Sequence, residues 1–114
     1  MAGTSWDRLG QMEAAFELVA PALRRVAKSS GARLREFFRD DPVWRLDFAR
    51  DTAGGEAVDV AWQEDRPEEY VVTALWWEGD RLRREDVGTF TRDRALDDLE
   101  TLLGDAIGRL PQSA

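Results

Sequence analysis

The chain has 114 residues, 43% of them hydrophobic, and a formal net charge of -7, which is typical of one folded domain and argues against a disordered chain. It contains no histidine and no cysteine, so serine–histidine and cysteine–histidine nucleophile systems, disulfides and thiolate metal sites are excluded. The 23 acidic against 16 basic residues oppose long-range attraction to nucleic acid or to an anionic membrane. We therefore expect a protein that is not an enzyme and that carries no metal or cofactor.

We expect no signal peptide in the first residues, because Asp7 and Glu17 interrupt the apolar runs there. The longest apolar stretch, Tyr70–Trp77, is far shorter than the roughly 20 residues that a membrane-spanning helix needs. We expect a soluble cytoplasmic protein, folded as a single α+β domain over residues 1–110 and followed by a short C-terminal tail at 111–114.

Apolar residues at alternating spacings of three and four predict a helical region from about Ser5 to Phe38. Pro21 lies inside this pattern, and a proline there kinks or breaks a helix. Gly31, after two serines, is a second weak point, so we expect one kinked helix or two consecutive helices. The buried stripe is predicted to contain Leu9, Met12, Phe16, Val19, Leu23 and Val26, and the apolar face to resume at Leu34, Phe37 and Phe38.

Strict alternation of apolar and polar residues predicts two strands, Val43–Arg50 and Ala57–Glu64. Because Asp59 and other polar residues take the alternate positions, one face of the sheet is expected to be buried and the other to face water. The residues predicted to point inward are Trp44, Leu46 and Phe48 in the first strand and Val58, Val60 and Trp62 in the second.

Two further strands, Tyr70–Trp77 and Arg81–Phe90, flank Gly79-Asp80, which is typical of a two-residue hairpin turn with glycine first. The charged residues of the fourth strand suit a sheet edge, where charge opposes unwanted pairing. Gly88 indicates a bulge in this strand. The turn predicts a register that pairs Trp77 with Leu82 and Trp76 with Arg83.

The last element is predicted as a helix from about Arg92 to Leu110, with Thr91 as its N-cap and Pro111 as its end. Its apolar face comprises Leu96, Leu99, Leu103, Ala106, Ile107 and Leu110. The predicted fold is therefore α+β in the order α-β-β-β-β-α. An antiparallel four-stranded meander sheet is flanked by a long, kinked or split N-terminal helix and by a C-terminal helix.

The strand Tyr70–Trp77 is apolar on both faces, unlike the two strands before it. Trp76 and Trp77 point to opposite sides, so one of them lies on the face that the other strands leave polar, unless a helix segment or Arg83 covers it. We therefore predict a non-catalytic protein-interaction module, a homo-oligomer or an adaptor, immunity or chaperone-like protein, which binds another protein or itself. The predicted interaction residues are Tyr70, Val72, Trp76, Trp77 and Arg83.

Two alternatives use other residues. A small-molecule carrier or sensor would have an aromatic pocket between helices and sheet, lined by Trp44, Phe48 and Trp62, although a close-packed core uses the same residues. A basic face could instead dock an acidic partner or nucleic acid, or simply be neutralised by the acidic strand loops, and the net charge weighs against nucleic acid. Its residues are Arg24, Lys28, Arg35 and Arg39, spaced 4, 7 and 4 apart.

The paired carboxylates Asp40-Asp41 and Asp97-Asp98 are sequence neighbours at a helix end and on a polar helix face. Arg94 stands four residues before Asp98, which predicts an ion pair between these two side chains. We therefore interpret these acids as solvated surface and not as a catalytic pair.

Overall fold

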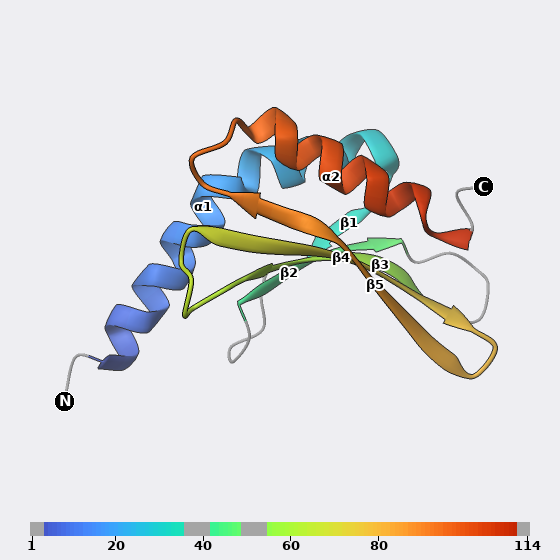
Figure 1. Ribbon diagram of the computed structural model, residues 1–114, viewed down its shortest axis with the longest axis horizontal. Coiled ribbons are helices and arrows are strands. Elements are labelled where there is room, and N and C mark those ends of the chain that lie inside the picture. Colours follow the sequence, from blue (N-terminus) through green and yellow to red (C-terminus); the bar gives the residue numbers. More distant parts are fainter. Residues whose placement is uncertain (1–3, 36–41, 49–54, 112–114) are drawn as a thin grey trace.

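The computed structural model describes residues 4–35, 42–48 and 55–111. It contains helix α1 (Thr4–Ser30), a five-stranded antiparallel sheet and helix α2 (Leu96–Gly108) (Figure 1). The α+β class and the antiparallel meander are confirmed, whereas the predicted count of four strands is wrong. In chain order and in sheet order the strands are β1 (Arg33–Arg35), β2 (Val43–Phe48), β3 (Glu56–Trp62), β4 (Glu69–Glu78) and β5 (Arg81–Thr91).

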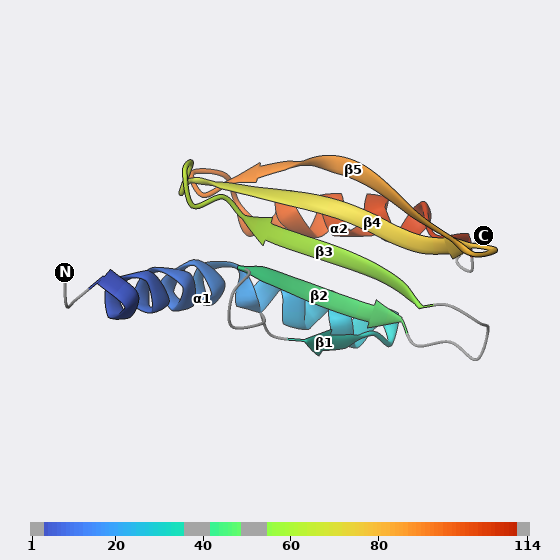
Figure 2. The same cartoon turned by 90° about the horizontal axis from the view of Figure 1, so that it is seen from below.

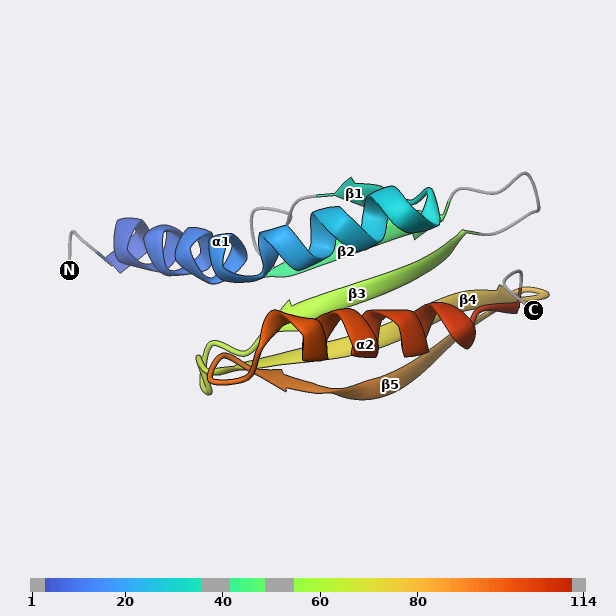
Figure 3. The same cartoon turned by 90° about the horizontal axis from the view of Figure 1, so that it is seen from above.

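Both helices pack on the same face of the sheet. Seen from above, α1 and α2 lie in front of the strands, and seen from the opposite side the strands lie in front of the helices (Figures 2 and 3). We call the face beneath the helices the inner face and the opposite one the open face. No helix or strand of the described residues covers the open face.

Helix α1 continues through Pro21 and is not split there. The proline side chain is exposed, while the neighbouring Ala20 and Ala22 are buried against the core. Their packing holds the helix together where proline removes one backbone hydrogen bond, and Figure 1 shows α1 changing direction along its length. The predicted stripe is buried except for Leu9, which is 37% exposed, so its assignment to the core is wrong.

Helix α1 ends at Ser30, so the predicted extension to Phe38 is wrong. Gly31 has a φ of 76°, and the N–H of Ala32 donates to the carbonyl of Ala27 at 3.0 Å. This left-handed C-terminal turn stops the helix and reverses the chain. The chain then forms β1, the one strand of the sheet that was not predicted, in which Leu34 packs against the core. Phe37 and Phe38 lie outside the described residues.

Four aromatic rings link α1 to the sheet. Phe16 of α1 lies 5.3 Å from Trp44 of β2, measured between ring centroids, Trp44 lies 6.3 Å from Tyr70 of β4, and Tyr70 lies 6.0 Å from Phe90 of β5. The hydroxyl of Tyr70 donates to the carbonyl of Ala15 at 2.8 Å. The inner face is therefore closed by tilted ring contacts, a favourable geometry for aromatic pairs.

The hairpin between β4 and β5 has the predicted register. Gly79 has a φ of 67° and is the first of two turn residues. Trp77 pairs with Leu82 and Trp76 with Arg83, and the register shifts opposite Val72 and Thr73, which confirms the bulge at Gly88. A Cβ atom at Gly88 would lie 2.8 Å from Cδ2 of Leu102, so this glycine also lets α2 approach β5.

Helix α2 begins at Leu96, four residues later than Arg92, and its N-cap is Ala95 without a side-chain hydrogen bond. Thr91 is not the N-cap because it is the last residue of β5, where it pairs with Glu69. The predicted ion pair between Arg94 and Asp98 is present, with Nε and Oδ2 3.1 Å apart. The predicted apolar residues do face the core: Leu99, Leu103 and Ala106 are buried, and Leu96 and Ile107 pack partly against it. Leu110 is also buried but lies beyond the helix, which ends at Gly108 and not at Leu110 as predicted.

We expect Gly31→Ala to lower the free energy of unfolding by about 1 kcal/mol, because alanine disfavours the left-handed conformation. Gly10→Ala is the matched control, since Gly10 is also exposed but lies within α1. There alanine should raise stability by about 0.5–1 kcal/mol. Urea unfolding measures both, and a change of the same sign in both variants would contradict the assigned helix end.

Tyr70→Phe removes the hydrogen bond to Ala15 and should cost about 1 kcal/mol at neutral pH. Burial raises the pKa of Tyr70, although the nearby charge of Arg92 opposes this shift. The unfolded chain therefore ionises this tyrosine first, and the stability from the neutral phenol is lost as pH rises above about 10. Urea unfolding at neutral and alkaline pH should show the wild type approaching the variant; a constant difference would refute this.

Candidate functional site

A row of polar side chains crosses the open face at right angles to the strands. The strand register places Arg35 of β1 opposite Arg45 of β2, Arg45 opposite Asp59 of β3, Asp59 opposite Thr73 of β4, and Thr73 opposite Asp86 of β5. Directly paired residues share one face of an antiparallel sheet. One polar residue from each strand thus lies in this line, which we call the charged row.

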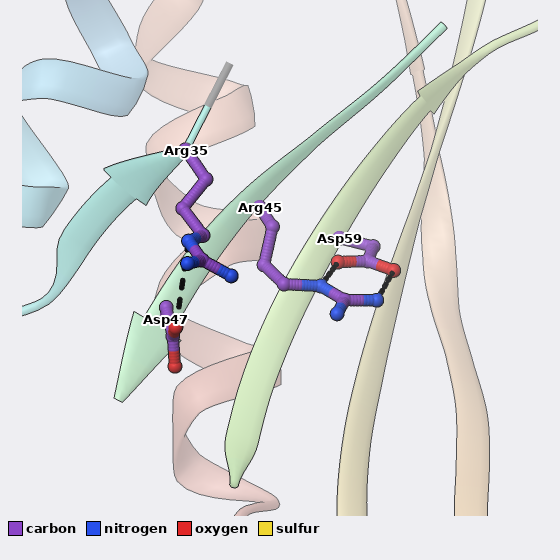
Figure 4. Close-up of polar contacts among 4 residues, drawn as sticks. All are labelled: Arg35, Arg45, Asp47 and Asp59. Atoms are coloured by element: carbon purple, nitrogen blue, oxygen red, sulfur yellow. Dashed lines mark hydrogen bonds and ion pairs between the residues drawn. The ribbon is translucent and has the colours of Figure 1, made fainter. Parts of the chain in front are cut away.

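The centre of the charged row is a two-pronged ion pair (Figure 4). Nε and Nη2 of Arg45 donate to Oδ1 and Oδ2 of Asp59 at 2.7 and 2.9 Å. On either side, Arg35 lies 3.8 Å from Asp47 in an ion pair, and Thr73 Oγ1 donates to Asp86 at 2.9 Å. The alternation of Asp59 with apolar residues predicted that this outward-facing acid would be in water. Asp59 is only 6% exposed, so that prediction is wrong for this residue.

This pairing keeps the open face polar but electrostatically satisfied. The hydrogen bond to Asp59 raises the pKa of Arg45 and outweighs the opposing effect of burial. Arg45 therefore remains a cation, and its planar guanidinium matches both carboxylate oxygens of Asp59. The carboxylate is held as a structural partner, which favours a structural role for it over one in proton transfer.

A groove of about 280 Å³ adjoins the charged row near the β4–β5 turn. Leu75 is buried within it, whereas Trp77 and Leu82, cross-strand partners, are 45% and 48% exposed. We call it the hairpin groove. Its lining combines four apolar side chains with three charged residues and one glycine: Ala57, Leu75, Trp77 and Leu82, then Arg45, Asp47 and Glu56, and Gly55.

The residues predicted for protein interaction do not share one surface. Tyr70 and Val72 have no exposed area and lie on the inner face, so their assignment to an exposed surface is wrong. Trp76 lies on that same side, half-buried, opposite the exposed Arg83. Trp77 alone of the five reaches the open face, because neighbouring residues of a strand point to opposite sides.

Leu75 and Leu82 were missed as candidate residues. Leu82 is the one apolar residue between Arg81 and Asp86. It was missed because the charged residues around it predicted an edge strand and not an apolar surface. The signal that could have found it was the hairpin register, which already placed Leu82 beside Trp77.

The three residues of the alternative aromatic pocket are part of the packed core. Trp44, Phe48 and Trp62 are at most 5% exposed. Trp44 packs between Phe16 and Tyr70, and Nε1 of Trp62 donates to the carbonyl of Pro67 at 2.9 Å. A ligand placed among these three side chains would have to displace them. A hollow of about 380 Å³ does lie at the edge of this packing, where Trp62 borders Gln11 and Ala14 of α1.

The predicted basic face is not formed on one helix, because α1 ends before Arg35. Arg24 lies 5.9 Å from the ring of Phe16 and Lys28 is exposed, both on α1. Arg35 instead belongs to β1 and points to the open face, while Arg39 lies outside the described residues. The neighbouring Arg25 forms a 3.1 Å ion pair with Glu100 of α2.

Comparison of the chain with protein-family models, with curated proteins and with solved structures finds no match. Neither described helix combines the length and apolar character needed to cross a membrane. Over residues 4–35, 42–48 and 55–111, no group of three or more aspartate or glutamate side chains is arranged to hold a metal ion. The open face is therefore the candidate functional surface.

Replacing either residue of the Arg45–Asp59 ion pair should destabilise the protein. We expect Asp59→Asn or Arg45→Met to lower the free energy of unfolding by about 1–3 kcal/mol, because each leaves a partly buried charge without its partner. The double variant Arg45→Met/Asp59→Asn should cost clearly less than the sum of the single costs. Arg94→Ala, which breaks an exposed pair, is the control and should change stability by at most about 0.5 kcal/mol. Additive costs in urea unfolding would contradict the coupling.

Proposed function

We propose that this chain is a non-catalytic protein-binding module whose hairpin groove receives an apolar side chain of a partner protein. The observation that carries the proposal is the exposure of Trp77 and Leu82, side by side on a sheet face that no described helix covers. Contiguous exposed apolar side chains, especially aromatic ones, are typical of protein-interaction surfaces.

The surroundings of the groove support a protein partner. Interfaces commonly place a few aromatic and arginine residues at their centre and charged groups at the rim. Here Trp77 and Leu82 form the apolar part, with Arg45 and Asp47 beside them and Arg84 next to Leu75 across the hairpin. Because Arg45 is already fixed by Asp59, binding would cost little additional side-chain ordering there.

The size of the groove is sufficient for a side chain of a partner protein. At about 280 Å³ it falls just below the roughly 300–1,000 Å³ typical of pockets that enclose a drug-sized compound. A leucine or phenylalanine side chain of a partner fits this scale. The absence of histidine and cysteine from the sequence and the pairing of Asp59 with Arg45 support a binding role without catalysis.

Site-specific photocrosslinking in the native cell tests the proposal. A photoreactive phenylalanine at position 77 or 82 should give a discrete cross-link to another protein, whereas the same residue at the exposed Thr101 of α2 should not. With the partner identified, Trp77→Ala should weaken binding by about tenfold or more, as hot-spot residues do. Equal cross-linking from position 101, or unfolding of the chain by Trp77→Ala, would refute a binding groove at Trp77.

A further inference from the structure

Strand β5 forms one edge of the sheet. Figures 2 and 3 show no described element along its outer side, because α2 lies over the inner face and not beyond the edge. The side chains from Arg81 to Asp86 are all exposed. The edge is therefore open to another strand, which would add to the sheet by backbone hydrogen bonding.

The two-residue turn determines which backbone groups of β5 point outward. In such a hairpin the residues that flank the turn, Glu78 and Arg81, form a hydrogen-bonded pair, and the pairs then alternate along the ladder. Arg83 therefore directs its N–H and C=O toward β4, whereas Leu82, Arg84 and Asp86 direct theirs away from the sheet. These three residues can pair with a further strand before the bulge interrupts the ladder.

The charge order along this edge is complementary to itself in the antiparallel direction. Arg83-Arg84 is followed directly by Glu85-Asp86, two cations and then two anions. An antiparallel second copy can therefore place an arginine of each edge opposite an acidic residue of the other. We propose that two copies of this chain associate through antiparallel pairing of their β5 edges, which joins the two five-stranded sheets into one.

The contacts of Glu85 and Asp86 favour one register, with Glu85 on the two-fold axis. Arg109 of α2 already forms an ion pair with Glu85, so the two facing Glu85 side chains are neutralised. Arg84 of each copy then lies opposite Asp86 of the other, and these pairs exchange their outward N–H and C=O groups. Asp86 accepts the Thr73 hydroxyl on Oδ1, which leaves Oδ2 for Arg84. Shifting the axis to Arg84 would instead place two arginines against each other.

The net charge of -7 per chain opposes self-association, but this repulsion acts over distance and is screened beyond about 8 Å at physiological ionic strength. Ion pairs formed at contact are screened less. Charges on an edge strand usually oppose pairing with other strands. Here their order favours pairing with an edge of the same sequence over other partners. The pairing is independent of the proposed function, because it uses the backbone edge and leaves the hairpin groove on the open face free.

Sedimentation equilibrium of the full chain, from low micromolar to near-millimolar concentration, tests the dimer. The wild type should show a monomer–dimer equilibrium, and Trp77→Ala should leave its Kd unchanged because Trp77 is not on the edge. Backbone amides of Arg84 and Asp86 should become protected from hydrogen exchange as concentration rises. A wild-type chain that stays monomeric up to near-millimolar concentration would overturn the proposal.

A charge exchange makes the test specific. Arg83→Glu/Arg84→Glu gives an edge of uniform negative charge, and Glu85→Arg/Asp86→Arg gives one of uniform positive charge. Each variant alone should have a Kd raised by about tenfold or more, while their mixture should form a heterodimer. Circular dichroism confirms that both fold. A negative-edge variant that dimerises like the wild type, or two folded variants that do not associate, would overturn the proposal.

Discussion

Both helices cover the same face of the sheet and leave the other face open, and the rest of the structure depends on this constraint. Helices α1 and α2 bury most of the inward apolar residues of the sheet, and the aromatic contacts from Phe16 to Phe90 all lie on that side. The opposite face has no covering helix among the described residues and must satisfy its own polar groups. The Arg45–Asp59 pair does this at the centre of the sheet, and the hairpin beyond it keeps apolar area exposed.

The periodic parts of the fold could be predicted from the sequence, and the helix boundaries could not. Alternation identified β2 and β3 with their inward faces, and the Gly79-Asp80 turn identified β4 and β5 with their register. Strand β1 was missed because Leu34 fits helical spacing equally well and three residues are too few to show alternation. The positive φ of Gly31 decides between a helix and a strand at Leu34, because it ends the helix. This φ depends on how the chain must turn to reach the sheet.

Of the four interaction residues predicted on β4, only Trp77 lies on the open face. Tyr70 pairs with the inward Trp62, so Tyr70, Val72 and Trp76 all point inward by the period of two. Sequence alone does not give that pairing, because it depends on the turn between β3 and β4. Trp77 is exposed only because both helices pack on the other face of the sheet, and this packing is set by tertiary contacts and not by the local sequence. The groove and the β5 edge thus arise from the arrangement of elements and not from a local motif.

The meander order has a consequence for the kinetics of folding. Every strand pairs with its neighbour in sequence, so each ladder closes a short loop and loses little chain entropy. Such low contact order favours rapid folding of the sheet. Contacts between α1 and α2 close much longer loops, as where Arg25 of α1 meets Glu100 of α2. We therefore expect docking of the two helices against each other to have a larger loop-closure cost than strand pairing and to follow it.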